Sequence, residues 1–404
     1  MKVLFFDYWL KGVANFNRLV SELKHQDQEV EIKMLHVGSW KEHLAQPVSS
    51  HNGFLSYDIS HYHTSSILKV LKKERPDVVV MLNIYLLLDK AVIAFCKKLG
   101  IKVVFVSHGR LSAATTATLG AKKTKKTLRD KLQKEPLLTL WNYAHSTLIS
   151  RKPGNLIKTL LKVARHKFQI AYPSKFSEEL DADEILVYYE SDREVLHHEK
   201  DFPLEKVKVV GNPELDDFVN LPIAGKDKFI SATGLDSPYL LYLDDGWVQA
   251  QLMEKDDWIK HITEVTRLAH DAGLRVAIKL HPRTPLEEYE DLFRSLDIKA
   301  FKNEVDFKSL IHYSDIVVSL ASTTISLALF LNKRIISPRF GPVADIFLNY
   351  PENVIHYSHT PDDFRKWLVN DEPTVSDLKY LDDNFRWCDG KVAKRIVGNI
   401  LNKS

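Results

Sequence analysis

The stretch Tyr239-Leu-Leu-Tyr-Leu-Asp-Asp-Gly246 ends an apolar run in two adjacent carboxylates and a glycine. The pattern recurs twice, because Val276-Ala-Ile-Lys-Leu-His-Pro-Arg283 ends in His-Pro and Asp315-Ile-Val-Val-Ser-Leu-Ala-Ser-Thr-Thr324 ends in a cluster of hydroxyl groups. Short aliphatic and β-branched runs bounded by polar residues, glycine or proline predict buried parallel strands. Ligands bind beyond the carboxyl ends of such strands in open α/β sheets. One cleft is therefore expected to receive a carboxylate, an imidazole and hydroxyl groups.

Strands alternate with helices along both halves of the chain. Strands are expected at residues 2–6, 30–36, 77–82, 102–106, 184–189, 206–210, 239–243, 276–280, 316–320 and 334–337. Helices are expected at residues 15–25, 65–73, 88–99, 192–198, 258–272, 286–295, 306–313, 324–331 and 391–402. Such a series predicts a doubly wound parallel sheet in each half.

A polar, turn-rich stretch at 220–238 marks the predicted boundary between the halves. We expect an α/β protein with Rossmann-like domains at 1–225 and 236–404, the second ending in a terminal helix. No first βα turn carries the G-x-G-x-x-G pattern of a dinucleotide site. Two Rossmann-like domains facing across a cleft therefore predict the GT-B architecture.

Length and composition agree with this division. A chain of 404 residues with 45% hydrophobic content is too large for one core and suits two domains. The two cysteines, Cys96 and Cys388, are too few for a disulfide framework, which favours a reducing compartment. No stretch approaches the roughly 20 apolar residues of a membrane span, and the amino end predicts a strand instead of a signal peptide. A cytoplasmic enzyme is expected.

The net charge of +3 hides an uneven distribution. A predicted helical insertion at about 112–170 contains a basic block from Lys122 to Lys167, with only Asp130 and Glu135 as acids. Apolar residues at partly helical spacing lie between the cations, as in an interfacial helix over anionic headgroups at the inner membrane. The alternative is a solvated helical insertion that packs on its own domain. A nucleic-acid partner is not expected, because the block contains no recognisable binding module.

The groups at the strand ends suit glycosyl transfer from a nucleotide-activated sugar. An acceptor hydroxyl is a poor nucleophile until a carboxylate takes its proton, and Asp244 or Asp245 can do so. His281 can give a proton or a hydrogen bond to the departing phosphate. The candidate contacts to the donor are Gly246, Lys279, Pro282, Arg283, Ser322, Thr323 and Thr324.

These candidate contacts act in different ways. Pro282 fixes the turn, and Lys279 and Arg283 add positive potential. The three hydroxyl residues precede a helical segment, whose first amides form an anion site. Structural alternatives stay open, because paired aspartates before glycine occur in ordinary turns and Ser-Thr-Thr before an apolar helix is commonly an N-cap.

The Asp244-Asp245-Gly246, His281-Pro282 and Ser322-Thr323 motifs resemble those of bacterial CMP-sialic-acid-dependent sialyltransferases and polysialyltransferases. The resemblance covers about residues 239–337. It implies that an acidic residue of the first motif is the general base, with Asp244 slightly favoured over Asp245. It also implies that His281 serves the CMP phosphate as partner or acid and that the hydroxyl motif binds the same phosphate. The Ser-Thr pair departs mildly from the serine pair of several members.

Other motifs widen the choice of donor. Ser107-His108-Gly109 looks like the His-Gly turn of capsule Kdo transferases and CDP-glycerol polymer transferases. His108 can therefore contact the acceptor or the donor, and the alternative is a hydrogen-bonded turn histidine. Asp7 and Asn15 lie where a GT-B acceptor site is expected, and their alternative is simple capping. Asp181-Ala-Asp183 precedes a predicted strand, which disfavours a metal-nucleotide clamp.

The sequence thus predicts an inverting, metal-independent transferase that needs no cofactor. It would move a CMP-activated nonulosonic acid of sialic type onto a saccharide acceptor in bacterial capsule polysaccharide or lipooligosaccharide synthesis. The first alternative is a GT-B transferase with a CMP-Kdo, CDP-linked or UDP-linked donor. The others are a non-catalytic GT-B-like scaffold and a sugar-nucleotide epimerase of the same fold, which needs further acid/base carboxylates that the sequence does not single out.

Overall fold

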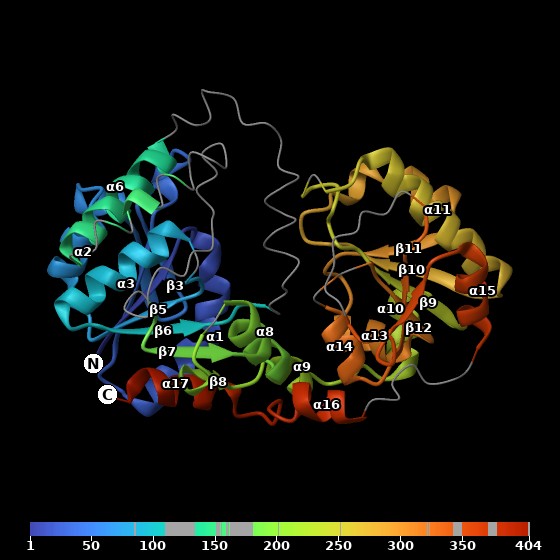
Figure 1. Cartoon of the computed structure of the whole chain (residues 1–404). Helices are drawn as coiled ribbons and strands as arrows, with labels where there is room; N and C mark the ends of the chain where they lie inside the picture. The colour runs from blue at the N-terminus through green and yellow to red at the C-terminus, as the bar shows by residue number, and fades with distance from the viewer. Residues whose placement is uncertain are drawn as a thin grey trace. The chain divides into compact units, whose positions relative to one another are not determined.

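The chain forms two compact units in the computed structural model, which is shown in Figure 1. The described residues are 1–84, 86–109, 134–150, 154, 156–158, 161, 181–200, 202–250, 252–320, 322, 324–341, 350–370 and 378–402. The first unit holds the described residues of 1–109, 134–213 and 387–402, and the second unit holds those of 214–386. Each unit carries its own sheet.

The described residues of the first unit build an eight-stranded sheet of order β3-β4-β2-β1-β5-β6-β7-β8. Neighbouring strands are parallel except for the antiparallel pair β3 and β4. The strands are β1 (Lys2–Asp7), β2 (Glu31–His36), β3 (Val48–His51), β4 (Phe54–Asp58), β5 (Val78–Met81), β6 (Lys102–Val106), β7 (Glu184–Val187) and β8 (Val207–Val209). The helices are α1 (Val13–Gln26), α2 (Ile67–Glu74), α3 (Leu87–Leu99), α6 (Lys134–Ile149), α8 (Glu190–Lys200) and α17 (Val392–Leu401).

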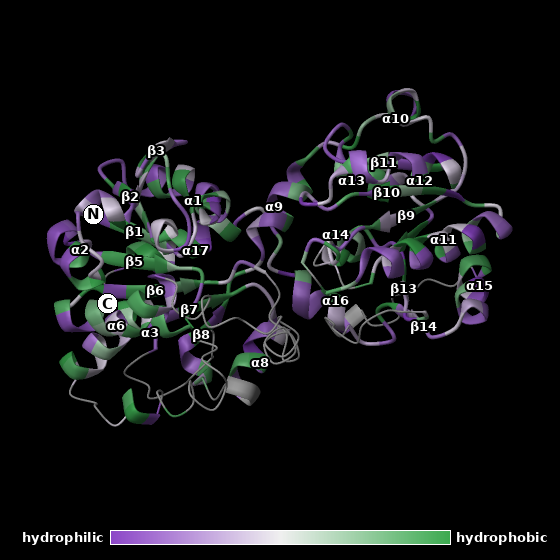
Figure 2. Ribbon diagram, turned by 90° about the horizontal axis from the view of Figure 1, so that it is seen from above, coloured by the Kyte–Doolittle hydropathy of each residue, from purple (hydrophilic) through white to green (hydrophobic). Residues whose placement is uncertain are grey.

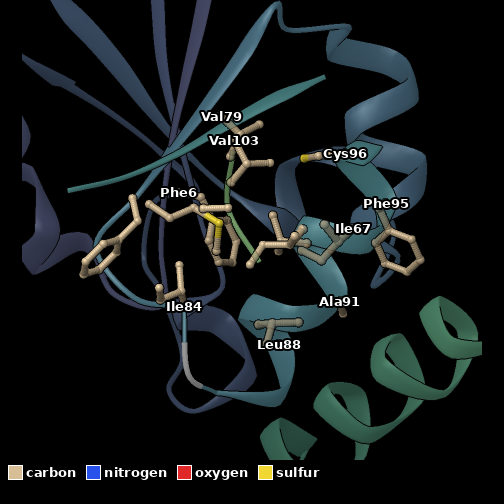
Figure 3. Close-up of a cluster of buried hydrophobic side chains, with 14 of the residues drawn as sticks. Phe6, Ile67, Val79, Ile84, Leu88, Ala91, Phe95, Cys96 and Val103 are labelled. Carbon is tan, nitrogen blue, oxygen red and sulfur yellow. The ribbon is translucent and has the colours of Figure 1, made fainter. Parts of the chain in front are cut away.

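Both faces of this sheet are covered, because successive side chains of a strand point to opposite faces. Phe5 stacks on Phe16 of α1 with ring centroids 4.3 Å apart, whereas Phe6 joins the core beneath α2 and α3. Figure 3 shows part of that core, drawn with labels on Phe6, Ile67, Val79, Ile84, Leu88, Ala91, Phe95, Cys96 and Val103. Strands buried on both faces are apolar along their length, as the green β5 in Figure 2 illustrates.

The second unit carries a six-stranded parallel sheet of order β11-β10-β9-β12-β13-β14 in its described residues. The strands are β9 (Tyr239–Leu243), β10 (Arg275–Lys279), β11 (Ile298–Phe301), β12 (Ile316–Val318), β13 (Arg334–Pro338) and β14 (His356–Ser358). The helices are α9 (Pro213–Asn220), which begins at the boundary, α10 (Lys226–Thr233), α11 (Lys255–Asp271), α12 (Glu290–Ser295), α13 (Phe307–Tyr313), α14 (Ile325–Phe330), α15 (Pro361–Val369) and α16 (Leu378–Phe385). β9 is central and buried along its whole length.

The division of the chain differs from the predicted one in two places. The stretch expected as a linker contains α10, whose Phe229 packs on Tyr313 of α13 with ring centroids 4.7 Å apart, so it belongs to the second unit. The terminal helix α17 belongs to the first unit instead of the second. Its buried side packs against α1 and β6, and Lys102 Nζ donates hydrogen bonds to the carbonyl oxygens of Asn399 and Asn402.

The predicted insertion at 112–170 falls largely outside the described residues, and so do most cations of the basic block. The described part contains α6, which the sequence did not predict as a separate element. It also contains the exposed Lys134 and Lys158. Among the described residues, no helix combines the length and the apolar character needed to cross a membrane.

Candidate active site

The three predicted motifs meet at one edge of the second unit's sheet. β10, β9 and β12 are adjacent and parallel, so their carboxyl ends lie side by side. Asp244 directly follows β9, His281 follows β10 after one intervening residue, and Ser322 follows β12 after three. The parallel pairing thus gathers the carboxylates, the imidazole and the hydroxyl groups, which are distant in the sequence.

Asp244 is buried, with 6% of its surface exposed, and its carboxylate accepts hydrogen bonds from three donors. Oδ1 accepts from the Gly246 amide at 3.1 Å. Oδ2 accepts from the His281 amide at 3.0 Å and from the Thr284 hydroxyl at 2.6 Å. These bonds tie the turn after β9 to the turn after β10. Asp244 is therefore built to hold the His-Pro turn in place.

His281 is held as the neutral tautomer that carries its proton on Nε2. The backbone amide of Arg283 donates to Nδ1 at 3.1 Å, and an amide can only donate, so Nδ1 must be the unprotonated nitrogen. Burial lowers the pKa of His281, the positive charges of Arg283 and Lys279 lower it further, and Asp244 opposes them. A second proton on Nδ1 would also face the Arg283 amide. The ring is half-buried and, among the described residues, no hydrogen-bond acceptor is found for Nε2–H.

Gly246 provides the space that this imidazole needs. A Cβ atom added to Gly246 would lie 2.6 Å from His281 Nδ1 and 2.7 Å from Cγ, closer than real Cβ contacts. The φ angle of Gly246 is +64°, in the left-handed region that glycine adopts readily. The glycine of the first motif is therefore required both by the backbone and by the ring of the second motif.

Asp245 connects the first motif to the hydroxyl motif. Its Oδ2 accepts from the Leu320 amide at 3.2 Å, and its Oδ1 accepts from the Ser319 hydroxyl at 3.3 Å. These bonds are longer than those of Asp244, and Asp245 is half-buried. The two adjacent aspartates thus point to different neighbours, one toward the turn after β10 and the other toward the turn after β12.

The hydroxyl motif forms a compact local network. Ser322 Oγ lies 2.6 Å from Thr324 Oγ1 and accepts from the Thr324 amide at 3.3 Å. Ser322 donates its own amide to Ser319 Oγ at 3.1 Å. Thr324 is the N-cap residue of α14, yet its side chain makes no capping hydrogen bond. Thr323 lies outside the described residues.

The two cations near the His-Pro motif, Lys279 and Arg283, differ in burial. Pro282 and Arg283 are exposed. Lys279 is half-buried, its Nζ lies 5.7 Å from the Phe307 ring centroid, and burial lowers its pKa. Of these residues, Arg283 is the cation that stands in solvent beside the imidazole.

Three candidates lie in the first unit. Asp7 ends β1, and its carboxylate rests against Gly12, where an added Cβ would lie 2.3 Å from Oδ2. Burial raises the pKa of Asp7 to about 6, although the Tyr8 amide and the charge of His36 oppose the shift. Asn15 lies half-buried in the first turn of α1.

His108, the third candidate of the first unit, follows β6. Its Nδ1 lies 2.9 Å from the Leu82 carbonyl oxygen, which fixes the proton on Nδ1. This bond agrees with the alternative of a hydrogen-bonded turn histidine, and a contact of His108 with the acceptor or the donor stays a prediction.

Sequence reasoning missed three residues of the second unit's network. Thr284 is buried and bonds Asp244, and the side-chain oxygen of Gln249 lies 3.0 Å from the same hydroxyl. Ser319 is fully buried between Asp245 and the Ser322 amide. The signal for Thr284 was its place three residues after His281, where a proline turn brings it back beneath the strand end. Gln249 had no such signal.

No protein-family model matches the chain, and no curated protein matches it in sequence. Solved structures do match along its whole length. UDP-GlcNAc 2-epimerase from Methanocaldococcus jannaschii is 18% identical with a TM-score of 0.52, covering 99% of each chain. UDP-GlcNAc 2-epimerase from Neisseria meningitidis bound to UDP-GlcNAc is 13% identical with a TM-score of 0.53, covering 100% of each chain.

A third similar structure is the wall teichoic acid polymerase TagF, which is 13% identical with a TM-score of 0.52. The match covers 98% of this chain and 87% of that one. Together these likenesses show that the chain has the GT-B fold, an α/β architecture with two parallel-sheet domains. The predicted fold class is confirmed.

Proposed function

We propose that the chain is a GT-B enzyme that binds a nucleotide-activated donor at the edge of its second sheet and transfers the activated group. The proposal is carried by His281, a neutral imidazole whose Nε2–H has no acceptor among the described residues. Such a group suits a phosphate oxygen, because it donates a hydrogen bond where negative charge develops. Arg283 adds positive potential beside it.

His281 acts in this proposal as a hydrogen-bond donor and keeps its proton. Protonating the ring would require Nδ1 to give up the Arg283 amide, and burial and nearby cations already lower the pKa. The leaving phosphate takes the electron pair of the bond to the transferred group and is stabilised by Nε2–H. Ser322 and Thr324 share one hydrogen bond between their hydroxyl groups, so the hydroxyl that accepts in this pair is a further donor at the same edge.

The two aspartates take different roles in this proposal. Asp244 has hydrogen bonds to three partners and positions the His-Pro turn. Asp245, with longer bonds and partial exposure, is the better candidate for the base that removes the acceptor hydroxyl proton. The acceptor oxygen then bonds to the donor carbon as the carbon–phosphate oxygen bond breaks. This order reverses the preference for Asp244 that the resemblance implied.

The donor is best described as a pyrimidine nucleotide with an activated group. The motif pattern favours CMP-linked nonulosonic acid, whereas the similar structures include UDP-GlcNAc 2-epimerase bound to UDP-GlcNAc and the polymerase TagF with CDPG. The structural likenesses therefore support the wider reading, a UDP-linked or CDP-linked donor, better than the narrower one. Capsule or lipooligosaccharide synthesis stays within this proposal as its narrower form.

A second candidate is epimerisation of a UDP-sugar, since several of the similar structures are UDP-GlcNAc 2-epimerases. The two functions give different products. A transferase releases nucleotide only when an acceptor is present or by slow hydrolysis, whereas an epimerase converts one UDP-sugar into another. Proton NMR of UDP-GlcNAc incubated with the enzyme distinguishes them.

Thermal shift with CMP, CDP, UDP and GDP tests the nucleotide site. A ligand that binds only the native protein raises its stability by mass action. We expect a pyrimidine nucleotide to raise the melting temperature and His281→Ala to abolish the shift. His270→Ala, which changes an exposed histidine of α11, is the matched control and should keep it. No shift with any of the four nucleotides would refute the proposal.

A further inference from the structure

Helix α6 of the first unit exposes three large apolar side chains while it buries several polar ones. Its fully buried residues are Thr139, Asn142, Tyr143, Ser146 and Thr147, four of which are polar and uncharged. Its most exposed large side chains are Leu137, Trp141 and Leu148, which expose 51%, 48% and 61% of their surface. A surface helix of a globular protein normally shows the opposite arrangement. The exposed apolar residues therefore need an explanation.

Hydrogen bonds fix the rotation of α6 in this orientation. Asn142 Oδ1 accepts from the Ile67 amide at 3.1 Å, at the start of α2, and Nδ2 donates to the Ser65 carbonyl oxygen at 3.0 Å. The hydroxyls of Ser146 and Thr147 are satisfied within α6 itself, because Ser146 donates to the Tyr143 carbonyl oxygen and Thr147 to that of Ala144. The polar residues thus face inward at little cost. Leu138, Leu140 and Ile149 pack partly buried against core residues, whereas Leu137, Trp141 and Leu148 are exposed.

The outward residues form one narrow stripe. At about 100° per residue, Leu137, Trp141 and Leu148 fall within about 40° of one another around the helix axis. Figure 1 shows α6 beside α2 and α3, and its main packing partner is α3. The stripe is therefore the side of α6 turned away from α3. We call it the α6 stripe.

The sequence that contains α6 is rich in basic residues. Lys134 opens the helix and is exposed, and from Lys131 to Lys175 the sequence contains a single acidic residue, Glu135. Apolar side chains with an indole, flanked by cations and nearly free of acids, match the surface of an anionic bilayer. Tryptophan suits the headgroup level, because its ring is apolar and its N–H is polar.

We propose that the α6 stripe docks on the surface of an anionic lipid bilayer, with Leu137, Trp141 and Leu148 inserted among the headgroups. Burial of the three side chains supplies the apolar contribution, and Lys134 supplies attraction to anionic lipid. The proposal does not involve the nucleotide site. It therefore stands or falls independently of the proposed function.

Cosedimentation with vesicles tests this docking. Full-length protein is mixed with phosphatidylcholine vesicles that contain or lack phosphatidylglycerol, at low and high salt. We expect binding to the anionic vesicles only, weakened by salt, and at least tenfold weaker in the combined variant Leu137→Ser, Trp141→Ser and Leu148→Ser. Val369→Ser in α15, where the side chain is 70% exposed, is the matched control and should bind like the wild type.

Two further measurements distinguish membrane docking from misfolding of the variant and from self-association of the chain. Far-ultraviolet circular dichroism and thermal unfolding without nucleotide check that the combined variant is folded like the wild type. Sedimentation velocity without lipid measures the oligomeric state. Equal vesicle binding by wild type and combined variant would overturn the proposal. So would a wild-type dimer that the variant converts to monomer while neither protein binds vesicles, because the α6 stripe would then contact a second copy of the chain.

Discussion

Replacing Asp244 by asparagine removes a charge while keeping the shape of the side chain. An amide has one accepting oxygen and one donating nitrogen. If the nitrogen takes the position of Oδ2 it faces the His281 amide, and if it takes the position of Oδ1 it faces the Gly246 amide. Either way one backbone donor loses its acceptor inside a buried site. The substitution is therefore more disruptive than its size suggests.

The expected loss follows from the hydrogen bonds. A hydrogen bond to a charged group contributes about 1.5–3 kcal/mol, and a buried donor left without a partner costs about 1–3 kcal/mol. We expect Asp244→Asn to lower the free energy of unfolding by about 2–4 kcal/mol. Asp245→Asn, whose bonds are longer and whose carboxylate is half-buried, should cost at most about 1 kcal/mol.

Urea unfolding followed by tryptophan fluorescence measures both variants, because Trp247 and Trp258 are buried in the second unit. A double-mutant cycle of Asp244→Asn with Thr284→Val should give a coupling energy of at least about 1 kcal/mol. Thr284→Ser keeps the hydroxyl and should therefore retain most of the stability that Thr284→Val loses. In a transfer assay, Asp245→Asn should lower kcat more than its effect on stability explains. Unchanged stability of Asp244→Asn, or no coupling to Thr284, would refute the positioning role.

Three other changes test separate parts of the structure. Gly246→Ala should cost about 1–2 kcal/mol for the left-handed backbone and should abolish the nucleotide-induced thermal shift, because its Cβ would displace His281. Asp7→Asn should stabilise the protein at pH 8 by up to about 3 kcal/mol, since the raised pKa of about 6 means that the folded protein loses stability as pH rises from about 4 to 6. That gain should vanish near pH 4, and a gain independent of pH would contradict the assigned cause. Burial alone would raise the pKa of Glu74. Hydrogen bonds from Lys2 and other donors outweigh burial and lower this pKa to about 2. The stability from Glu74, present above about pH 4.5, is lost as pH falls toward 2, so Glu74→Gln should flatten acid unfolding curves over that window.

Much of the fold was predictable because parallel strands carry a strong local signal. The runs at 103–106 and 239–243 are continuous and apolar, and β6 and β9 contain these positions. β3, β4, β11 and β14 were missed because these strands of three to five residues mix polar with apolar side chains and have no continuous apolar run. The packing of α17 on the first unit was not predictable either, since an amphipathic face does not encode which sheet covers it.

The site was predictable to the level of strand ends but not of contacts. Parallel pairing alone brings Asp244, His281 and Ser322 to one edge, so their grouping needed only the strand assignments. The different environments of Asp244 and Asp245 depend on backbone amides and on Thr284, which no spacing reveals. The tautomer of His281 likewise depends on one amide, that of Arg283.

The return of α17 to the amino-terminal sheet makes the first unit discontinuous in sequence, whereas the described part of the second unit is a single stretch. Residues 214–386 can therefore be excised as one piece, but the first unit requires its carboxyl-terminal strip to be supplied or fused. A stop codon just before residue 387 would strip cover from α1 and β6. Loss of residues 387–402 would thus destabilise the part of the sheet built from residues 1–109, far from them in the sequence.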